Sequence, residues 1–212
     1  MHRRHLLTLL ALSTTPAAWA QTAPQWTVVK LLSYDCPVCF AYEAHDTFLE
    51  QRLTSKKTRL VKAPIVSLKE DDGAKARVFY ASRKLGPAYS SAVASALYKG
   101  AQGNGLPLND FPSTYTWLEQ ELIKTPEDAT RLSALFTDAQ SPESRAALDR
   151  ALTIAYNVGV NAIPAYVILS PDNTPVAMFD PTSAPGGPAA LREALLKKLD
   201  ELQTATPPSK NP

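Results

Sequence analysis

The sequence is poor in cysteine, histidine and methionine, the residue types on which soft-metal sites and disulfide frameworks depend. Its 212 residues include two cysteines, three histidines and two methionines. A single possible cysteine pair cannot build the multiple disulfides of a small secreted scaffold. A zinc site needs four ligands. The nearby supply is Cys36, Cys39 and His45, because His2 and His5 lie in the first twenty residues. We therefore expect no metal.

The sequence also lacks an excess of charge of one sign. It has 22 basic and 20 acidic residues, a net charge of +2. The first twenty residues contribute Arg3 and Arg4 and no acid, so the remainder has 20 residues of each sign. A balanced chain offers no electrostatic argument for binding nucleic acid or an anionic lipid surface.

A long apolar run of membrane-spanning length is missing, but the first twenty residues have a pattern of their own. A basic start at Arg3 and Arg4 precedes the apolar stretch 6–12 and the small-x-small sequence Ala18-Trp19-Ala20. This pattern is typical of a secretory signal peptide and is too short for a membrane span. We expect cleavage near Ala20/Gln21, by general export or by a twin-arginine route.

The two cysteines stand at Cys-x-x-Cys spacing in the stretch Ser33-Tyr34-Asp35-Cys36-Pro37-Val38-Cys39-Phe40. A β-rich apolar run, 26–34, comes before them and a helical pattern comes after. Pro37 suits the first turn of a helix, where its missing N–H would have no partner. A bridge across two residues would restrain the unfolded chain little, so a purely structural disulfide is disfavoured. This setting favours thiol–disulfide exchange.

The remaining pattern predicts further strands and a long helical block. Strands are expected at 58–66, after Pro164 as far as 169, and at 176–179. Helices are expected from 37 to 51 or 53, and at 74–85, 87–99, 112–123, 126–136, 142–157 and 189–202, with a cap at 71–73 and a glycine-rich loop at 100–105. The sequence therefore predicts an α/β fold carrying an all-helical insertion.

This order of elements resembles the thioredoxin superfamily, in which a cis proline before the third strand lies against the cysteine pair. Pro164, in Gly-Val-Asn-Ala-Ile-Pro, would fill that role. The long helical block resembles exported DsbA-type thiol:disulfide oxidoreductases. The resemblance implies a discontinuous thioredoxin-like domain of residues 21–66 and 141–203. It also implies a signal peptide at 1–20, a helical insertion at 67–140 and a flexible tail at 204–212.

Placement assigns the roles of the two cysteines. A helix N-terminus stabilises a thiolate, so Cys36 is the expected nucleophile. Cys39, one turn inside, is the expected resolving residue. By resemblance, the backbone of Ile163, before Pro164, would pair with a bound peptide. The pattern departs from the DsbA family at Val38, where a histidine is common, and at Asp35, which adds a like charge beside the thiolate. These departures predict a moderated oxidant.

Lys30 is the third departure, since relatives often have a buried acid at this strand position. One interpretation is that Lys30 extends from the strand end to solvent. The other is that it pairs with Glu43, one helical turn beyond Cys39, with Lys62 beside them on the second strand. Such a pair could relay the proton of Cys39.

The leading functional hypothesis is a periplasmic dithiol oxidase that passes its disulfide to folding exported proteins. By resemblance, a DsbB-type membrane quinone oxidoreductase would reoxidise it. A monomer without nucleic acid or bound cofactor is expected. The alternatives are a reductase or isomerase of the same fold, or a copper- or peptide-binding module. Copper is weakly supported because Met178 is the one methionine left after processing.

Overall fold

The computed structural model describes residues 25–66 and 72–205, and the expected signal peptide, Asp71 and residues 206–212 lie outside this part. A four-stranded sheet in the order β2-β1-β3-β4 forms its centre. The strands are β1 (Thr27–Leu32), β2 (Arg59–Pro64), β3 (Ala165–Leu169) and β4 (Pro175–Phe179). Strand β2 is parallel to β1, whereas β3 is antiparallel to both β1 and β4. This is the thioredoxin-like sheet that the sequence predicted.

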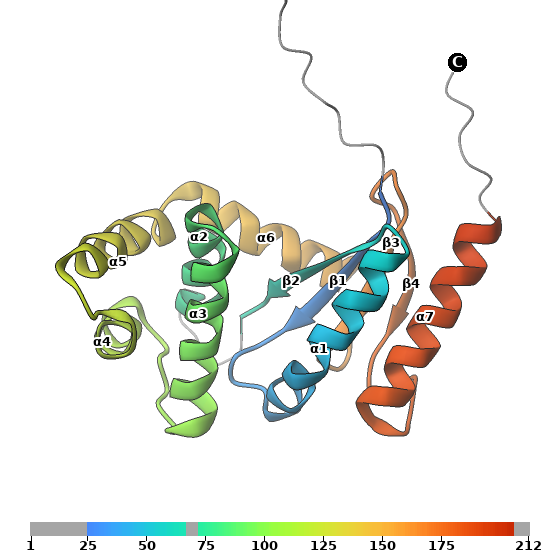
Figure 1. Cartoon of the computed structure of the whole chain (residues 1–212), viewed down its shortest axis with the longest axis horizontal. Helices are drawn as coiled ribbons and strands as arrows, with labels where there is room; N and C mark the ends of the chain where they lie inside the picture. The colour runs from blue at the N-terminus through green and yellow to red at the C-terminus, as the bar shows by residue number, and fades with distance from the viewer. Residues whose placement is uncertain (1–24, 67–71, 206–212) are drawn as a thin grey trace, which may run out of the picture.

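Helices cover both faces of the sheet (Figure 1). They are α1 (Pro37–Ser55), α2 (Ala74–Ser82), α3 (Pro87–Tyr98), α4 (Phe111–Leu122), α5 (Pro126–Ala139), α6 (Pro142–Asn157) and α7 (Gly187–Ala205). Helices α1 and α7 lie on one face, α6 lies across the other, and α2 to α5 gather beside the sheet. The fold is thus thioredoxin-like with added helices where the sequence predicted them, while the domain boundaries themselves stay a prediction.

Strand β1 is buried along its whole length because both faces of the sheet are covered. Val28 joins the apolar core beneath α1 and α7. Val29 and Leu31 belong to the second core, which continues into the added helices. Successive side chains of a strand point to opposite faces. Lys30 therefore shares the face of Val28, toward α1, and this places a cation in the interior.

Local capping explains where several helices begin. Thr125 and Asp128 form a capping box, in which each side chain accepts a hydrogen bond from the backbone N–H of the other residue. Asp110 and Ser141 accept from backbone N–H groups in the same way at the starts of α4 and α6. The helix expected from 142 to about 157 is confirmed.

Other boundaries differ from the sequence prediction. The first strand is shorter than 26–34, the helix expected at 74–85 changes to a 3₁₀ turn at Arg83–Leu85, and α7 includes Thr204 and Ala205 from the expected tail. The sequence predicted an N-terminal cap at 71–73, and for Asp72 this prediction is wrong. Gly73 caps α2 with a positive φ of 67° and no side-chain bond. Asp72 instead pairs with Arg77 and Arg145, which removes it from a capping role.

The expected glycine-rich loop at 100–105 is also wrong, because Lys99–Gly103 continues α3 as a π-helical turn. The N–H of Asn104 donates to the carbonyl of Lys99 over 3.0 Å and closes this wider turn. Gly100 permits it, since a Cβ there would lie 2.6 Å from Nε1 of Trp117. Close packing against the indole, rather than loop flexibility, accounts for this glycine.

Replacing Gly100 with alanine is expected to lower the free energy of unfolding by about 1–3 kcal/mol, the usual cost of overpacking. The Trp117 indole cannot retreat freely because its N–H donates to the carbonyl of Ala96 over 2.7 Å. Gly103→Ala is the matched control, since the nearest atom to its Cβ is 3.8 Å away. Urea unfolding of both variants measures the difference, and equal midpoints would contradict the packing argument.

None of the helices in the described part of the chain has the length and apolar character that a membrane crossing requires.

Candidate active site

Cys36 occupies the N-cap position of α1. Strand β1 ends at Leu32, and a short turn brings the chain to the helix, where the N–H of Cys36 donates to the carbonyl of Ser33 over 3.2 Å. The backbone N–H of Cys39 donates to Sγ of Cys36 over 3.0 Å. Capping side chains normally satisfy such unpaired N–H groups with an oxygen. A sulfur in this position receives both the hydrogen bond and the positive end of the helix dipole.

Cys39 is fully buried one turn into α1, whereas Cys36 is partly exposed, and both are thiols in this structure. The residues around them form an apolar rim. Pro37 is exposed, and Val38 and Phe40 are 45% and 47% exposed. An incoming sulfur can therefore reach Cys36 but not Cys39. This is the arrangement that the sequence predicted for an attacked and a resolving thiol.

The loop before β3 completes the site. The Ile163–Pro164 peptide bond is cis, as the resemblance implied. The thiol of Cys36 donates to the carbonyl of Ile163 over 3.6 Å, which joins two segments 127 residues apart in sequence. An open hollow of about 430 Å³ lies beside the thiol. It is lined by Ser33, Asp35, Cys36, Ile65, Val66, Val160, Asn161, Ala162 and Ile163.

The environment moves the pKa values of the two thiols in opposite directions. A hydrogen bond from the Cys39 thiol lowers the pKa of Cys36 from 9.0 to about 7, with further help from the backbone N–H groups of Cys39 and Val38. The same hydrogen bond raises the pKa of Cys39, and burial adds to this effect. The exposed sulfur is therefore the one that carries negative charge near neutral pH.

The lowered pKa of Cys36 predicts a pH-dependent stability that belongs to the reduced protein. Between pH 7 and 9 the unfolded chain holds more protons on Cys36 than the folded chain does, so stability should rise with pH in this window. The contribution should be lost as pH falls through about 7. Urea unfolding of the reduced and oxidised proteins at pH 6, 7 and 8 tests this. Parallel pH profiles for the two forms would contradict the shift.

A buried group of charges lies on the α1 face of the sheet. Lys30 is fully buried, with Nζ 3.2 Å from Oε2 of Glu43 and 2.8 Å from Oδ2 of Asp46. Lys62 pairs with the same two acids. The strand register explains why the two lysines lie close together, since Lys30 is paired with Lys62 on β2 and with Tyr166 on β3. The interpretation that Lys30 extends to solvent is therefore wrong, and its pairing with Glu43 is observed.

Asp46 is the member of this charge cluster that sequence reasoning missed. It lies three residues after Glu43, on the face of α1 that also carries Cys39, and it accepts a hydrogen bond from the Tyr166 hydroxyl over 3.3 Å. Burial raises the pKa of Asp46 despite the two lysines. Burial also opposes ionisation of Glu43, but Lys30 and Lys62 outweigh it and lower the pKa. The helical spacing 39, 43, 46 was a signal that could have found Asp46.

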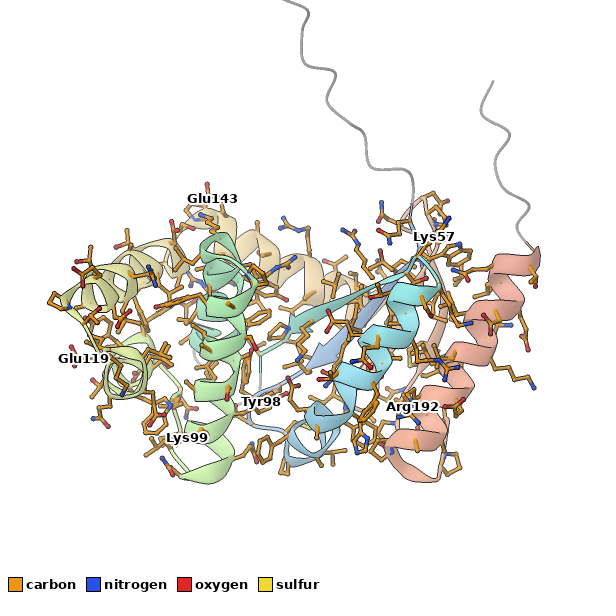
Figure 2. The ribbon with its side chains drawn as sticks, viewed as in Figure 1. Lys57, Tyr98, Lys99, Glu119, Glu143 and Arg192 are labelled. Atoms are coloured by element: carbon orange, nitrogen blue, oxygen red, sulfur yellow. The ribbon has the colours of Figure 1, made fainter. Side chains whose placement is uncertain are left out.

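Helices α2 and α3 and the π-helical turn after α3 also contact the active-site turn between β1 and α1. Tyr98, labelled in Figure 2, lies at the end of α3 and packs edge-on against the ring of Tyr34, with 4.7 Å between the ring centroids. The centroid of its ring is 5.5 Å from that of Phe40. The side-chain amide of Gln102 donates to the carbonyl of Tyr34 over 2.7 Å. Oδ2 of Asp35 lies 3.2 Å from Nζ of Lys75 on α2. No pattern in the sequence linked these residues to the cysteines, because the contacts join segments far apart in the chain.

The described residues contain no group of three or more histidine, cysteine or acidic side chains placed to hold a metal ion. The chemistry that the site offers is that of two sulfur atoms with unequal exposure and unequal pKa values.

Comparison with solved structures finds the same fold in disulfide oxidoreductases. DsbA from Pseudomonas aeruginosa superposes with a TM-score of 0.68 at 18% identity, covering 90% of this chain and 92% of that one. DsbA from Xylella fastidiosa gives 0.66 at 16% identity, with 87% and 89% covered. An oxidoreductase from Neisseria meningitidis, DsbA1, gives 0.59 at 19% identity, with 87% and 88% covered. No protein-family model matches the sequence, and neither does any curated protein.

Proposed function

We propose that the protein is a dithiol–disulfide oxidoreductase that donates the Cys36–Cys39 disulfide to exported proteins as they fold in the periplasm. One observation carries the proposal. Sγ of Cys36 sits at the start of α1, receives the N–H of Cys39 and lies beside the Ile163 carbonyl, with the buried Cys39 directly behind it. The fold shared with DsbA structures and the secretory pattern of residues 1–20 support the substrate class and the compartment.

The exchange follows from the exposure of the two sulfurs. A substrate thiolate attacks Sγ of Cys36, the Cys36–Cys39 bond breaks, and Cys39 leaves as a thiolate that takes up a proton. A second substrate thiol, as its thiolate, then attacks the substrate sulfur of the mixed disulfide. Cys36 leaves as a thiolate, two electrons have passed to the protein, and the substrate holds the new disulfide. Regeneration requires an oxidant, which we propose to be a membrane quinone oxidoreductase of the DsbB type.

The hollow beside Cys36 suits a peptide substrate. Its wall combines the apolar side chains of Ile65, Val66 and Val160 with the backbone of Ile163, which precedes Pro164. We propose that the backbone of Ile163 pairs with an extended segment of substrate next to the exposed sulfur. A backbone partner of this kind accepts many sequences, which suits a protein that serves many clients.

The opposite direction of electron flow is the second candidate, and the Cys36 pKa of about 7 favours it. A lower pKa stabilises the reduced form and makes the disulfide more oxidising. The strongly oxidising DsbA has a value near 3.5, whereas thioredoxin has a value near 7. The sequence predicted a moderated oxidant from Val38 and Asp35, and this stays a prediction. A reductase would share this pKa, so the redox equilibrium has to decide between them.

Equilibration with glutathione buffers tests the proposed direction. An oxidase must give up its disulfide readily, so the pair is expected to be reduced at a cytosol-like poise of about −240 mV. Catalysed oxidation of a reduced, unfolded model protein supplies the second readout. A pair that stays oxidised at this poise, together with no catalysed oxidation, would overturn the oxidase proposal in favour of a reductase or a structural bridge.

We further propose that the charge cluster of Lys30, Glu43, Asp46 and Lys62 exchanges the proton of Cys39. The positive charge of Lys30 favours the Cys39 thiolate. Glu43 and Lys62 line a second hollow of about 390 Å³ between the sheet edge and helices α2 and α3, which gives the cluster access to water. Burial raises the pKa of Asp46 whereas the pKa of Glu43 is lowered, so Asp46 is the acid of the cluster that takes up a proton more readily.

Replacing Asp46 with asparagine is expected to slow the reverse reaction with a disulfide substrate, in which Cys39 must lose its proton to attack the mixed disulfide, by about a hundredfold, the lower range for a lost proton-transfer group. Its pH–rate profile should also lose one inflection. Stopped-flow reaction with a fluorescent disulfide substrate measures both quantities. Asp149→Asn, on an exposed position of α6 outside the hollow lined by Glu43 and Lys62, is the matched control. A slower rate with an unchanged pH profile would indicate a structural role.

A further inference from the structure

Asp35 directly precedes the nucleophile, and a carboxylate there opposes formation of the Cys36 thiolate. The structure supplies a partner that the sequence did not suggest. Nζ of Lys75, the second residue of α2, lies 3.2 Å from Oδ2 of Asp35. The Lys75 side chain is 1% exposed, whereas that of Asp35 is 24% exposed. The pair therefore joins a buried cation of the added helices to a partly exposed acid of the active-site turn.

The position of the Lys75 ammonium is set by a segment between α3 and α4. Nζ donates to the carbonyls of Pro107 and Leu108, at 3.0 Å each. Leu108 is 2% exposed and has a positive φ of 43°, a conformation that branched or bulky residues rarely adopt. Its carbonyl also accepts from the Thr114 hydroxyl over 3.2 Å. Two carbonyls thus hold the cation in place independently of Asp35.

We propose that Lys75 is a positioning residue that sets how oxidising the Cys36–Cys39 disulfide is, by cancelling the charge of Asp35 beside Cys36. This inference rests on the proposed redox function. It assigns part of the control of the Cys36–Cys39 disulfide to a residue of α2, one of the helices beside the sheet. Among the described residues, Cys39 and Lys30 act on the Cys36 thiol. To these we add Asp35, next to Cys36 in the chain, and Lys75, which pairs with Asp35.

The size of the effect follows from Coulomb's law. A carboxylate about 7 Å from the Cys36 thiolate changes the ionisation equilibrium of Cys36 about threefold in a water-like dielectric. At an effective dielectric constant of 20 the change is about fiftyfold. Asp35 is partly buried, so its effect on Cys36 should fall between these limits. The effect of Lys75 has the opposite sign, so the paired cation reduces the effect of Asp35 on Cys36.

Three variants test the proposal: Lys75→Met, Asp35→Asn and the double variant. Each is equilibrated with glutathione, in which two glutathione thiols reduce one protein disulfide and form one glutathione disulfide. Lys75→Met should raise the Cys36 pKa by about 0.4 to 1.7 units. At a pH well above that raised pKa, where Cys36 of the reduced protein is ionised in every variant, it should make the disulfide about threefold to fiftyfold harder to reduce. Asp35→Asn should shift both quantities the opposite way. The double variant should return near wild type. Thiolate absorbance in the ultraviolet gives the pKa directly.

Lys99→Met is the matched control, because Lys99, labelled in Figure 2, is 57% exposed and pairs with Glu121 on α4. It should change neither quantity. If Lys75→Met does not fold, Asp35→Asn and the double variant still decide the question. Shifts of the same sign in Asp35→Asn and Lys75→Met, or no shift in Asp35→Asn, would overturn the proposal. The wild-type equilibrium is measured separately, so failure of the redox function itself would be recognised first.

Discussion

Replacing Lys30 with methionine is expected to lower the free energy of unfolding by about 3–5 kcal/mol, the usual cost of breaking a buried ion pair from one side. The variant leaves Lys62 as the cation that pairs with the carboxylates of Glu43 and Asp46. Asp46 is 5% exposed, so water cannot replace the lost partner. Urea unfolding of the oxidised protein provides the measurement.

Two further variants separate charge from packing in this experiment. Lys198→Met removes an exposed cation that pairs with Glu201 on α7, and it should cost less than about 1 kcal/mol. The double variant Lys30→Met/Asp46→Leu restores charge balance, since it leaves one acid and one lysine. It should recover part of the lost stability. A double variant no more stable than Lys30→Met alone would contradict the electrostatic account.

Replacing Cys39 with alanine is expected to stop turnover and to accumulate mixed disulfides between Cys36 and substrate. Without Cys39 no Cys36–Cys39 disulfide can form, so the adduct arises when the Cys36 thiolate attacks a substrate disulfide and one substrate sulfur leaves as a thiolate. In the wild type Cys39 releases such an adduct intramolecularly, and a well-positioned group corresponds to an effective concentration on the order of 10⁵ M or more. The variant lacks this route, so the adduct should persist much longer. Non-reducing electrophoresis shows the adducts, and mass spectrometry then names the trapped proteins.

Cys36→Ala is the matched variant for this trapping experiment. It should form no adduct, because the remaining sulfur of Cys39 is fully buried behind the exposed position. Both variants should also lose catalysed oxidation of a reduced substrate. Adducts on Cys36→Ala in numbers equal to those on Cys39→Ala would show that the roles of the two sulfurs are assigned the wrong way round.

The elements that sequence reasoning predicted well are those specified locally. Cys36 and Pro37 lie where a helix must begin, and Thr125 and Ser141 are capping residues whose effect does not depend on the rest of the fold. Pro164 was placed by resemblance together with the strand that follows it, and its cis bond is confirmed. Such features follow from a few neighbouring residues.

The features that were missed depend on residues far apart in the chain. The ion pair between Asp35 and Lys75 joins β1's end to α2, and the hydrogen bond from Gln102 to Tyr34 joins a π-helical turn to the same place. The sequence left open whether Lys30 reaches solvent or pairs with Glu43. Burial and strand register decide this, and both depend on residues far away in the chain. Asp46 is the exception, since its helical spacing from Cys39 was readable in the sequence.

The two edges of the sheet have a consequence for association between molecules. An uncovered strand edge can pair with a second sheet and seed aggregation. Here β4 begins with Pro175, which has no N–H to offer, and its register with β3 shifts at Ile168/Leu169. At the other edge β2 ends at Pro64, and its middle lines the hollow shared with α2 and α3. Neither edge presents a long flat ladder, so the folded protein should stay free of strand-mediated self-association.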